Sequence, residues 1–427
     1  MRLPGAPLAL LLAAALPAFA GLPDASWSSL SVSFAPAVRP QAVAPAAAAP
    51  TVPAVSFKGL VLKSVQFSRA DRIPESLAAA IDKTEKTLDL ALYDLKLAEA
   101  ADAILRAHRR GVKVRLIYDM GHAKPPSDPA AGGGASPEYS SLVAAGVPVR
   151  LLKGGGSFGI MHHKFALLDG ELLITGSFNW TRAADEKNFE NMVFKTDAAL
   201  IEGFTRCWNW MWPLGKEPQA AAAELASGVF GSEEDEDVSF SIAAEPSAAG
   251  PGAPPADPSR PVSFGGAAFP RYAFSPQGGV EALLIDAIGR SKKRIDVAIF
   301  SMYSMPVAQA LVAAKKRGVA VKVVADAGQS RRSQAVRALF DGGVPLRLLG
   351  GRDGGLGVMH HKYALFDGAM LMSGSYNFSQ NAELYNFEAD LFTTAAPETA
   401  AFAAESALLW KQAKAPADGD LAAPKEL

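Results

Sequence analysis

The chain has 427 residues, of which 49% are hydrophobic and 20% are charged, and its net charge at pH 7 is −1. Since a typical domain has ~100–200 residues, this length predicts two domains, each large enough to bury a hydrophobic core. The near-neutral charge is unlike that of a dedicated nucleic-acid-binding protein. The single cysteine, Cys207, excludes an intrachain disulfide and a cysteine-based zinc site.

The first twenty residues have the pattern of a secretory signal sequence. Arg2 gives a positively charged start, residues 8–16 form a short apolar stretch, and Ala18-Phe19-Ala20 fits a cleavage site between small residues. The apolar stretch is shorter than the ~20 residues that a membrane-spanning helix needs. We therefore expect cleavage after Ala20 and export, with the mature protein in the periplasm or secreted.

Two segments further along the chain have the composition of mobile linkers. Residues 21–56 are rich in Ala, Pro and Val, and residues 216–262 combine Ala, Gly, Pro and Ser with an acidic run at 233–237. We interpret the acidic run as a solubilising feature rather than a calcium or partner site. Because the second segment carries a net charge of −7, the rest of the chain carries +6, which suits an anionic substrate.

The predicted organisation is, in chain order, a signal sequence, a linker, a folded half, the acidic linker, a second folded half and a tail. Their bounds are residues 1–20, 21–56, 57–215, 216–262, 263–415 and 416–427. The two halves are copies of one unit, because Val65–Asp119 aligns with Tyr272–Asp326 at a constant offset of 207 residues. Their later parts align at an offset of 198, since the first copy has a longer loop at 121–139, a candidate lid.

Within each half, short β-rich runs alternate with a helical stretch. In the first half, residues 88–93 and 112–118 have the character of strands, and the Ala/Leu-rich residues 97–110 between them have helical spacing and stop at Gly111. Alternation of this kind predicts an α/β layer fold in which helices pack on a mixed sheet.

Each copy also carries one set of polar residues at one spacing. The blocks read MHHKFALLDGELLITGSFNWTRAADEKNFEN from Met161 and MHHKYALFDGAMLMSGSYNFSQNAELYNFEA from Met359. A His-x-Lys-x-x-x-x-Asp pattern opens each block, and Gly-Ser-x-Asn and Asn-Phe-Glu follow at equal distances. The matching residues are His162, Lys164, Asp169, Ser177, Asn179 and Glu190 in the first block, and His360, Lys362, Asp367, Ser375, Asn377 and Glu388 in the second.

Strand alternation selects the reactive histidine of each block. The sequence around each motif is apolar and suited to a strand, so His162 and Lys164 share one face and His163 points to the other. The same reasoning selects His360 over His361. A lone histidine on a strand is more often structural, but the repetition of the complete pattern favours a chemical role.

Both blocks look like the HKD motifs of the phospholipase D superfamily, and this resemblance implies cleavage of a phosphodiester. That reaction needs a nucleophile, a proton for the leaving oxygen and positive charge for the phosphoryl oxygens. Histidine titrates near neutral pH, so His162 and His360 can divide the first two tasks. Lys164 and Lys362 are expected to hold the phosphoryl oxygens. The groups expected to assist the lysines are those of Ser177, Asn179, Ser375 and Asn377. With these groups in place, we expect a site that needs neither a metal ion nor another cofactor.

The acidic residues of each block have different expected roles. Glu190 and Glu388 are expected to accept a hydrogen bond from the far ring nitrogen of a reactive histidine and so fix its orientation. Asp169 and Asp367 complete the catalytic motif. Each stands at a strand-to-turn step before a glycine, however, and we interpret both as mostly structural.

Within the phospholipase D superfamily, the compact halves are similar to the small branch of bacterial endonucleases and mitochondrial cardiolipin hydrolases, the Zucchini-like group. The resemblance covers about residues 60–213 and 270–412. It implies two tandem α/β/α units with mixed sheets, related by a pseudo-twofold axis that brings both reactive histidines to one phosphate. By analogy with tandem members, we expect His162 to be the nucleophile that forms a phosphohistidine; a label trapped on His360 would reverse this assignment.

The sequence thus favours an exported phospholipase D-type phosphodiesterase that hydrolyses head-group phosphodiester bonds of phospholipids. Export and the near-neutral charge favour a phospholipid at a membrane surface, whereas the compact halves favour the alternative, a metal-independent endonuclease that cleaves DNA or RNA. A phosphatidyl transferase and a non-catalytic binding protein are less favoured. Since both halves of the site lie in one chain, we expect an active monomer without an obligate protein partner.

Overall fold

The structure is a computed structural model, and it describes residues 52–124, 134–228, 230–232, 252–355 and 357–423, all within one compact unit that spans residues 49–427. The expected signal sequence and the acidic run at 233–237 lie outside the described residues. In the parts of the chain that the structure describes, every helix is too short or too polar to cross a membrane.

The first half contains a seven-stranded mixed sheet. Its strands are β3 (Val65–Phe67), β4 (Thr87–Leu92), β6 (Lys113–Asp119), β7 (Val149–Leu152), β8 (Lys164–Leu168), β9 (Leu172–Gly176) and β11 (Asn191–Lys195). The order is β3-β11-β9-β8-β4-β6-β7. β4, β6 and β7 are parallel, whereas every pair from β4 through β8, β9 and β11 to β3 is antiparallel.

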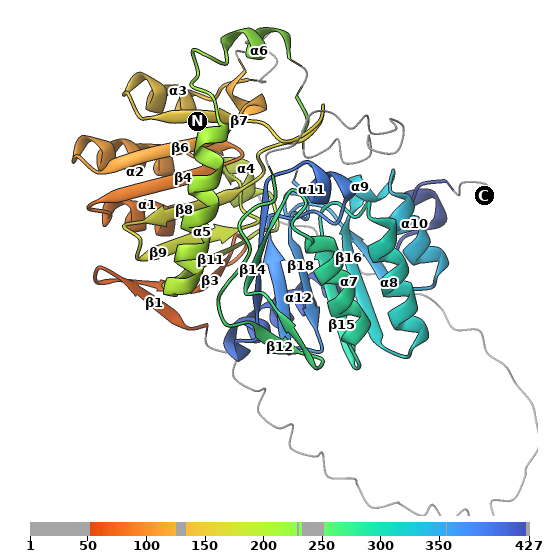
Figure 1. Ribbon diagram of the computed structural model, residues 1–427. Helices are drawn as coiled ribbons and strands as arrows, with labels where there is room; N and C mark the ends of the chain where they lie inside the picture. Colours follow the sequence, from red (N-terminus) through yellow and green to blue (C-terminus); the bar gives the residue numbers. More distant parts are fainter. Residues whose placement is uncertain (1–51, 125–133, 229, 233–251, 356, 424–427) are drawn as a thin grey trace, which may run out of the picture. The chain divides into compact units, whose positions relative to one another are not determined.

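The second half repeats this sheet strand for strand (Figure 1). Its strands are β14 (Tyr272–Ser275), β15 (Arg294–Ile299), β16 (Ala320–Asp326), β17 (Leu346–Leu349), β18 (Lys362–Phe366), β19 (Met370–Gly374) and β20 (Glu388–Thr393). The order is β14-β20-β19-β18-β15-β16-β17, with the same parallel and antiparallel pairs. The predicted duplication and the predicted α/β fold with mixed sheets are both confirmed.

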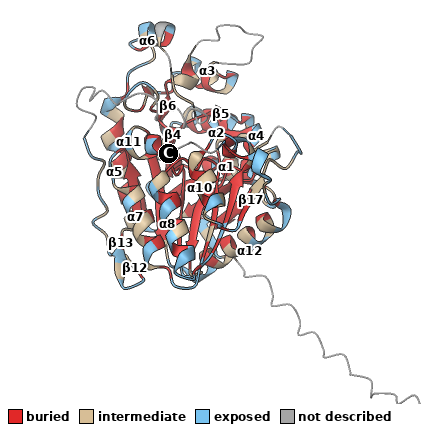
Figure 2. Cartoon of the chain, turned by 90° about the vertical axis from the view of Figure 1, so that its right-hand side faces the viewer, coloured by how far each residue is buried: buried red, intermediate tan, exposed pale blue. Residues whose placement is uncertain are grey.

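Helices cover both faces of each sheet. The outer helices are α1 (Ile73–Asp82), α2 (Ala98–Arg109) and α3 (Pro137–Ala144) in the first half, and α7 (Val280–Arg290), α8 (Met305–Lys316) and α10 (Gln334–Asp341) in the second. Each outer set shares a hydrophobic core with one face of its sheet. The inner helices are α5 (Ala198–Met211) and α12 (Ala396–Gln412). Figure 2 shows the strands as mostly buried, between helices whose outward faces are exposed.

The inner faces of both sheets, together with α5 and α12, form a third hydrophobic core that the halves share. Phe204 of α5 makes edge-to-face ring contacts with Phe165 of its own half and Phe274 of the other half, each with centroids 5.1 Å apart. Phe402 of α12 makes the reciprocal contact with Phe67, at 5.3 Å. Each inner helix therefore packs an aromatic residue that the other half supplies.

The local structure follows the sequence pattern closely. The helix expected at 97–110 is α2, and the strands expected at 88–93 and 112–118 are β4 and β6, each within a residue of the expected bounds. Gly111 has a φ of +89°, which an L-residue with a side chain rarely adopts, so it ends the helix and turns the chain into β6. Gly318 does the same after α8 with a φ of +90°.

The remaining elements are short. They are β1 (Ala54–Phe57), β2 (Leu60–Lys63), β5 (Leu95–Lys96), β10 (Trp180–Thr181), β12 (Val262–Phe264), β13 (Ala267–Phe269), α4 (Arg182–Glu186), α6 (Ala222–Ser227), α9 (Ala327–Ser330), α11 (Gln380–Leu384), η1 (Gly121–Ala123), η3 (Trp212–Leu214) and η5 (Asp418–Asp420).

Both segments with linker composition contain secondary structure where they adjoin the halves. β1 begins at Ala54, inside residues 21–56, and ends at Phe57, the first residue of the predicted half, and α6 lies within residues 216–262. Before α6, Lys216 and Leu151 exchange two backbone hydrogen bonds of 2.7 and 2.9 Å, and Leu225 packs into the first-half core. A few apolar residues and two backbone hydrogen bonds are enough to dock this stretch, and composition averaged over a long window does not reveal them.

Replacing Phe204 by alanine should reduce the free energy of unfolding by about 3–5 kcal/mol, because the fully buried ring contacts aromatic residues of both halves. Urea unfolding of the wild type and the variant measures this loss. Glu202→Ala, at an exposed position on the same helix, is the control and should change stability little. Equal losses in both variants would contradict the shared core.

Candidate active site

Each motif segment is joined to the other half of the chain by backbone hydrogen bonds. His162 N–H donates to Phe387 O at 3.0 Å, and Phe387 N–H donates to Ile160 O at 3.0 Å. In the mirrored arrangement, His360 N–H donates to Phe189 O at 3.0 Å. Short parallel bridges therefore pair the His-x-Lys segment of one half with the Asn-Phe-Glu segment of the other, so that both motifs belong to one site.

The glutamates of the motif orient the histidines, and they do so across the halves. Nδ1 of His162 lies 2.8 and 2.9 Å from the two carboxylate oxygens of Glu388, and Nδ1 of His360 lies 2.8 Å from Oε1 of Glu190. All four side chains are buried. Because a carboxylate only accepts hydrogen bonds, each contact favours the tautomer with its hydrogen on Nδ1, which leaves Nε2 of the ring for chemistry.

The two lysines lie beside the reactive histidines. Lys362 Nζ is 2.8 Å from Nε2 of His360, and Lys164 Nζ donates to the backbone oxygen of His162 at 2.8 Å. Each ammonium group also lies over an aromatic ring, Tyr93 for Lys164 at 4.8 Å and Phe300 for Lys362 at 4.9 Å. Two buried cations at the histidines match the expected phosphoryl-binding role.

The serines take a different place from the one expected. Ser177 Oγ donates to Glu190 at 2.7 Å, and Ser375 Oγ donates to Glu388 at 2.6 Å. A hydroxyl has a single hydrogen, so in this structure both serines donate to the glutamates, and the expectation that they bind phosphoryl oxygens stays a prediction. The physical reason is that a buried carboxylate must be satisfied by nearby donors. Asn179 and Asn377 lie in the turns after β9 and β19, and their phosphate-binding role stays a prediction.

Asp169 and Asp367 do not join the site. Each follows the far end of its motif strand. Five residues of extended chain separate it from the lysine, which corresponds to about 16 Å. Asp169 accepts three backbone N–H groups of residues 85–87, and Asp367 accepts three of residues 292–294. These contacts support the structural interpretation of both aspartates, and their place in the catalytic set stays a prediction.

The electrostatics of these two aspartates agree with a structural role. Burial acts to raise the pKa of Asp169, but Lys58 and the backbone N–H groups outweigh burial and hold this pKa below its usual value. Backbone N–H groups likewise outweigh burial at Asp367 and lower its pKa. Both aspartates have a left-handed φ, 54° and 53°, at the turn that follows the strand.

The second histidine of each pair faces the other side of its strand, as the alternation predicted. His163 is buried against the rings of Phe165 and Phe274, and burial lowers its pKa well below the usual range. His361 contacts the side-chain amide of Asn191 at 2.9 Å. Neither ring shares the face of the reactive histidines: His163 packs among aromatic rings, and His361 lies between the polar side chains of Asn191 and Glu405.

Two further aspartates position the motifs and were missed in the sequence. Asp119, at the end of β6, accepts the backbone N–H of Met161 at 3.0 Å, and Asp326, at the end of β16, accepts that of Met359 at 3.0 Å. Burial raises the pKa of both, to about 6 for Asp119. The sequence did contain a signal for them, because Asp119 and Asp326 are the last residues of the two segments that align at the offset of 207.

The asparagine of each Asn-Phe-Glu run was also missed as a positioning group. Asn188 Oδ1 accepts the N–H of Val358 at 3.1 Å while its Nδ2 donates to Glu190 at 3.2 Å. Asn386 makes the same pair of contacts with Ile160 and Glu388, at 3.1 and 3.4 Å. Each amide therefore links a glutamate to the opposite motif segment.

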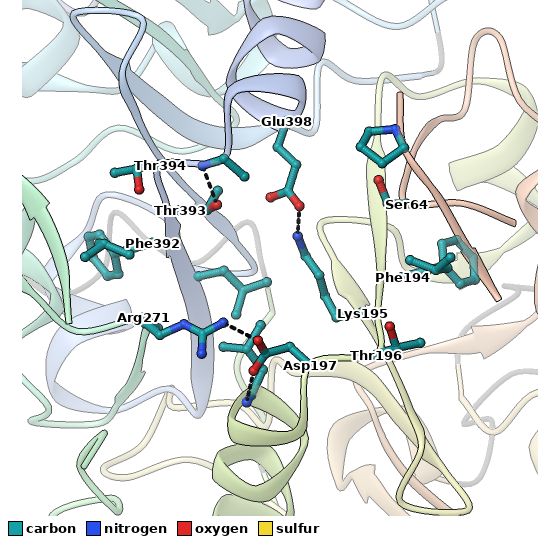
Figure 3. Close-up of a pocket in the computed structure, with 16 residues that line it drawn as sticks. Ser64, Phe194, Lys195, Thr196, Asp197, Arg271, Phe392, Thr393, Thr394 and Glu398 are labelled. Atoms are coloured by element: carbon teal, nitrogen blue, oxygen red, sulfur yellow. Dashed lines mark hydrogen bonds and ion pairs between the residues drawn. The ribbon is translucent and has the colours of Figure 1, made fainter. Parts of the chain in front are cut away.

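A cavity of about 460 Å³ lies where β11 and β20 end, at the ends of these strands that are farther from Glu190 and Glu388 (Figure 3). Two ion pairs across the halves line it: Arg271 with Asp197 at 2.8 Å, and Lys195 with Glu398. None of the motif residues borders this cavity. It is therefore separate from the candidate active site, and its charges are paired with one another.

The family comparison agrees with this geometry. The family model described as "Cardiolipin synthase, PLD-like domain" matches residues 77–212 and again residues 284–410. The chain belongs to this family. Each match covers one half, so the two sheets are two PLD-like domains in tandem.

Individual relatives match about a third of this chain. A mitochondrial cardiolipin hydrolase of Chlamydomonas reinhardtii is 35% identical over 154 residues, which are 35% of this chain and 64% of that protein. A phospholipase D of Rickettsia conorii is 33% identical over 132 residues, 31% of this chain and 60% of that protein. The chain thus spans less than two thirds of the length of these relatives. Phosphatidylserine synthase of Haemophilus influenzae has the same fold over 86% of this chain and 90% of its own, with a TM-score of 0.56 and 12% identity.

The buried carboxyl of Asp119 should make stability depend on pH. Its pKa is raised from 3.8 to about 6 in the folded protein, so the stability linked to its proton is complete below pH 3.8 and is lost as the pH rises through 6. Asp119→Asn cannot lose that proton and keeps the acceptor for Met161. From pH 4 to 7, the unfolding free energy of the wild type should fall by about 2–3 kcal/mol relative to the variant.

Urea unfolding at a series of pH values measures this difference. Val61→Ala, an exposed position without a titratable group, is the control, and its difference from the wild type should not change with pH. A constant difference between wild type and Asp119→Asn from pH 4 to 7 would show that Asp119 is ionised in the folded protein throughout.

Proposed function

We propose that the protein is a metal-independent phosphodiesterase of the phospholipase D type, which hydrolyses the head-group phosphodiester bond of phospholipids. The observation that carries the proposal is the pair of buried histidines whose Nδ1 atoms are held by glutamates of the opposite half. Each histidine has a lysine beside it. Two oriented imidazoles and two cations are the groups that metal-free cleavage of a phosphodiester requires.

The proposed reaction has two displacement steps. Nε2 of one histidine attacks phosphorus, and the bond from phosphorus to the head-group oxygen breaks while the other histidine gives that oxygen a proton. The product is a phosphohistidine and a free alcohol. The second histidine, now neutral, takes a proton from water, whose oxygen attacks phosphorus and releases the first histidine. Following tandem members of the family, we assign the attack to His162.

The lysines would stabilise the charge that builds up on the phosphoryl oxygens in both steps. Lys164 and Lys362 are buried, so their charges act in a medium of low dielectric constant, where electrostatic interactions are stronger than in water. Glu190 and Glu388 would stabilise each imidazolium as it forms. The crossed contacts make each histidine depend on both halves, which supports one site per chain and an active monomer.

Phospholipid is the proposed substrate because of the relatives and the charge. Proteins named cardiolipin hydrolase and phospholipase D match 35% and 31% of this chain. The net charge of −1 is low for an enzyme that must neutralise several phosphates of a nucleic acid. The proposal includes export to the periplasm or the exterior, on the pattern of residues 1–20. An endonuclease with the same chemistry is the second candidate, favoured by the charge of +6 outside the acidic linker.

A substrate panel in EDTA tests the proposal. Phosphatidylcholine, phosphatidylethanolamine and cardiolipin vesicles are compared with single- and double-stranded nucleic acid. The wild type should release head groups in EDTA, and His162→Ala and His360→Ala should each lower turnover by about 10³-fold or more, because each removes a reacting group. His108→Ala, remote from the motifs, is the control and should retain activity.

Three outcomes would contradict parts of this proposal. Loss of all activity in EDTA would contradict the metal-free mechanism. Cleavage of nucleic acid alone would replace the lipid substrate by the second candidate. Activity of His162→Ala at the wild-type level on every substrate would remove the two-histidine mechanism itself.

A further inference from the structure

The two half-sites match at the reactive histidines but differ on one flank. The first half carries three charged or titratable residues there, Asp94, Lys96 and His122. At the offset of 207, the second half carries Ser301, Tyr303 and Gln329. In the second half, Tyr303 donates to the backbone and side-chain oxygens of Gln329 at 3.2 and 3.3 Å. One flank is therefore polar and neutral, and the other is charged.

The charged flank borders the candidate active site. The ring of Tyr93 lies edge-on to His122, with centroids 4.4 Å apart, and edge-on to His162, with centroids 4.8 Å apart. The two imidazoles are therefore separated by no more than the sum of these distances, 9.2 Å. Lys164 lies over the same tyrosine ring at 4.8 Å. The distance from His162 to His122 can therefore be spanned by one small group of a substrate held at His162 and Lys164.

The backbone fixes His122 relative to the motif. Its N–H donates to Oδ1 of Asp119 at 3.2 Å, and Oδ2 of the same carboxylate accepts the N–H of Met161. One buried carboxylate thus anchors both His122 and the residue that precedes His162. The distance between the two imidazoles is consequently set by the fold.

In the cluster of Asp94, Lys96 and His122, the two hydrogen-bond donors are more exposed than the acceptor, Asp94. Asp94 contacts Lys96 Nζ at 2.8 Å, His122 Nδ1 at 3.6 Å and the hydroxyl of Tyr118 at 3.4 Å. The Asp94 side chain is only 10% exposed, whereas those of Lys96 and His122 are 42% and 24% exposed. An ammonium group has three donors and an imidazole has two nitrogens, so each keeps capacity beyond its contact with Asp94. A group rich in acceptor oxygens fits this arrangement.

We propose that Lys96 and His122, oriented by Asp94, form a subsite that binds a second phosphate group of the substrate. This phosphate would lie one glycerol or sugar unit from the phosphate that is cleaved, because the two imidazoles are at most 9.2 Å apart. The inference rests on the proposed function for its lipid substrate. The subsite itself follows from the asymmetry of the two flanks.

Two lipids that differ by a single phosphate test the subsite. Phosphatidylglycerol and phosphatidylglycerophosphate are presented in the same mixed micelles in EDTA. His122→Gln introduces the residue that the second half uses, and Lys96→Gln removes the ammonium charge. Each variant should lower kcat/KM for phosphatidylglycerophosphate by about 3- to 10-fold, mainly through KM, and leave that for phosphatidylglycerol unchanged. His108→Gln, whose ring contacts Ala145 O at 3.1 Å on the outer surface, is the control.

A soluble pair separates the subsite from the choice of lipid. Thymidine 5′-(p-nitrophenyl phosphate) is compared with the same compound carrying a 3′-phosphate. A preference for the second phosphate that disappears in His122→Gln supports the subsite in either pair. If only the nucleotide pair is cleaved and shows this preference, the subsite is supported and the proposed lipid substrate is contradicted. If the lipids are cleaved and the variants affect both lipids equally, the subsite is overturned and the proposed function is kept. If neither pair is cleaved, the subsite and the proposed function are both overturned.

Discussion

The crossed contacts between glutamate and histidine are the constraint on which the rest of the structure depends. Glu388 holds His162, and Glu190 holds His360, so neither reactive ring is oriented by its own half. A buried imidazole and a buried carboxylate each lose water on folding, and they recover that loss only when their geometry is good. The backbone bridges, the asparagine amides and the shared aromatic core all keep the two halves in the register that this geometry requires.

The same constraint explains how a duplicated chain forms one site instead of two. Each motif segment leads into a strand of its own sheet but completes its hydrogen bonds with the other half, as at His162 and Phe387. Phe204 and Phe402 repeat this exchange in the core, since each packs against a phenylalanine of the other half. The near-symmetry ends at the flank of Asp94, Lys96 and His122. The two sides of the site differ there, so they would bind the two ends of a substrate differently.

Much of the fold and of the site could be predicted from the sequence, and the failures have physical reasons. Strand alternation selected His162 over His163, and the duplicated spacing located the lysines and glutamates. The crossing could not be predicted, because two nearly identical blocks give each histidine two equivalent glutamates. The contact of Ser177 with Glu190 could not be predicted either, because a motif gives the presence of a hydroxyl and not its partner. Asp119 was overlooked since its role is a contact with the backbone 42 residues away.

The most direct test of the crossed arrangement is the ¹⁵N NMR spectrum of the histidine ring nitrogens in single glutamine variants. His162 and His360 are assigned by their loss in the corresponding alanine variants. The account predicts that Glu388→Gln shifts the ring nitrogens of His162 and leaves those of His360 in place, and that Glu190→Gln does the reverse. If each variant instead perturbed the histidine of its own half, Glu388 acting on His360 and Glu190 on His162, the crossed site would be contradicted.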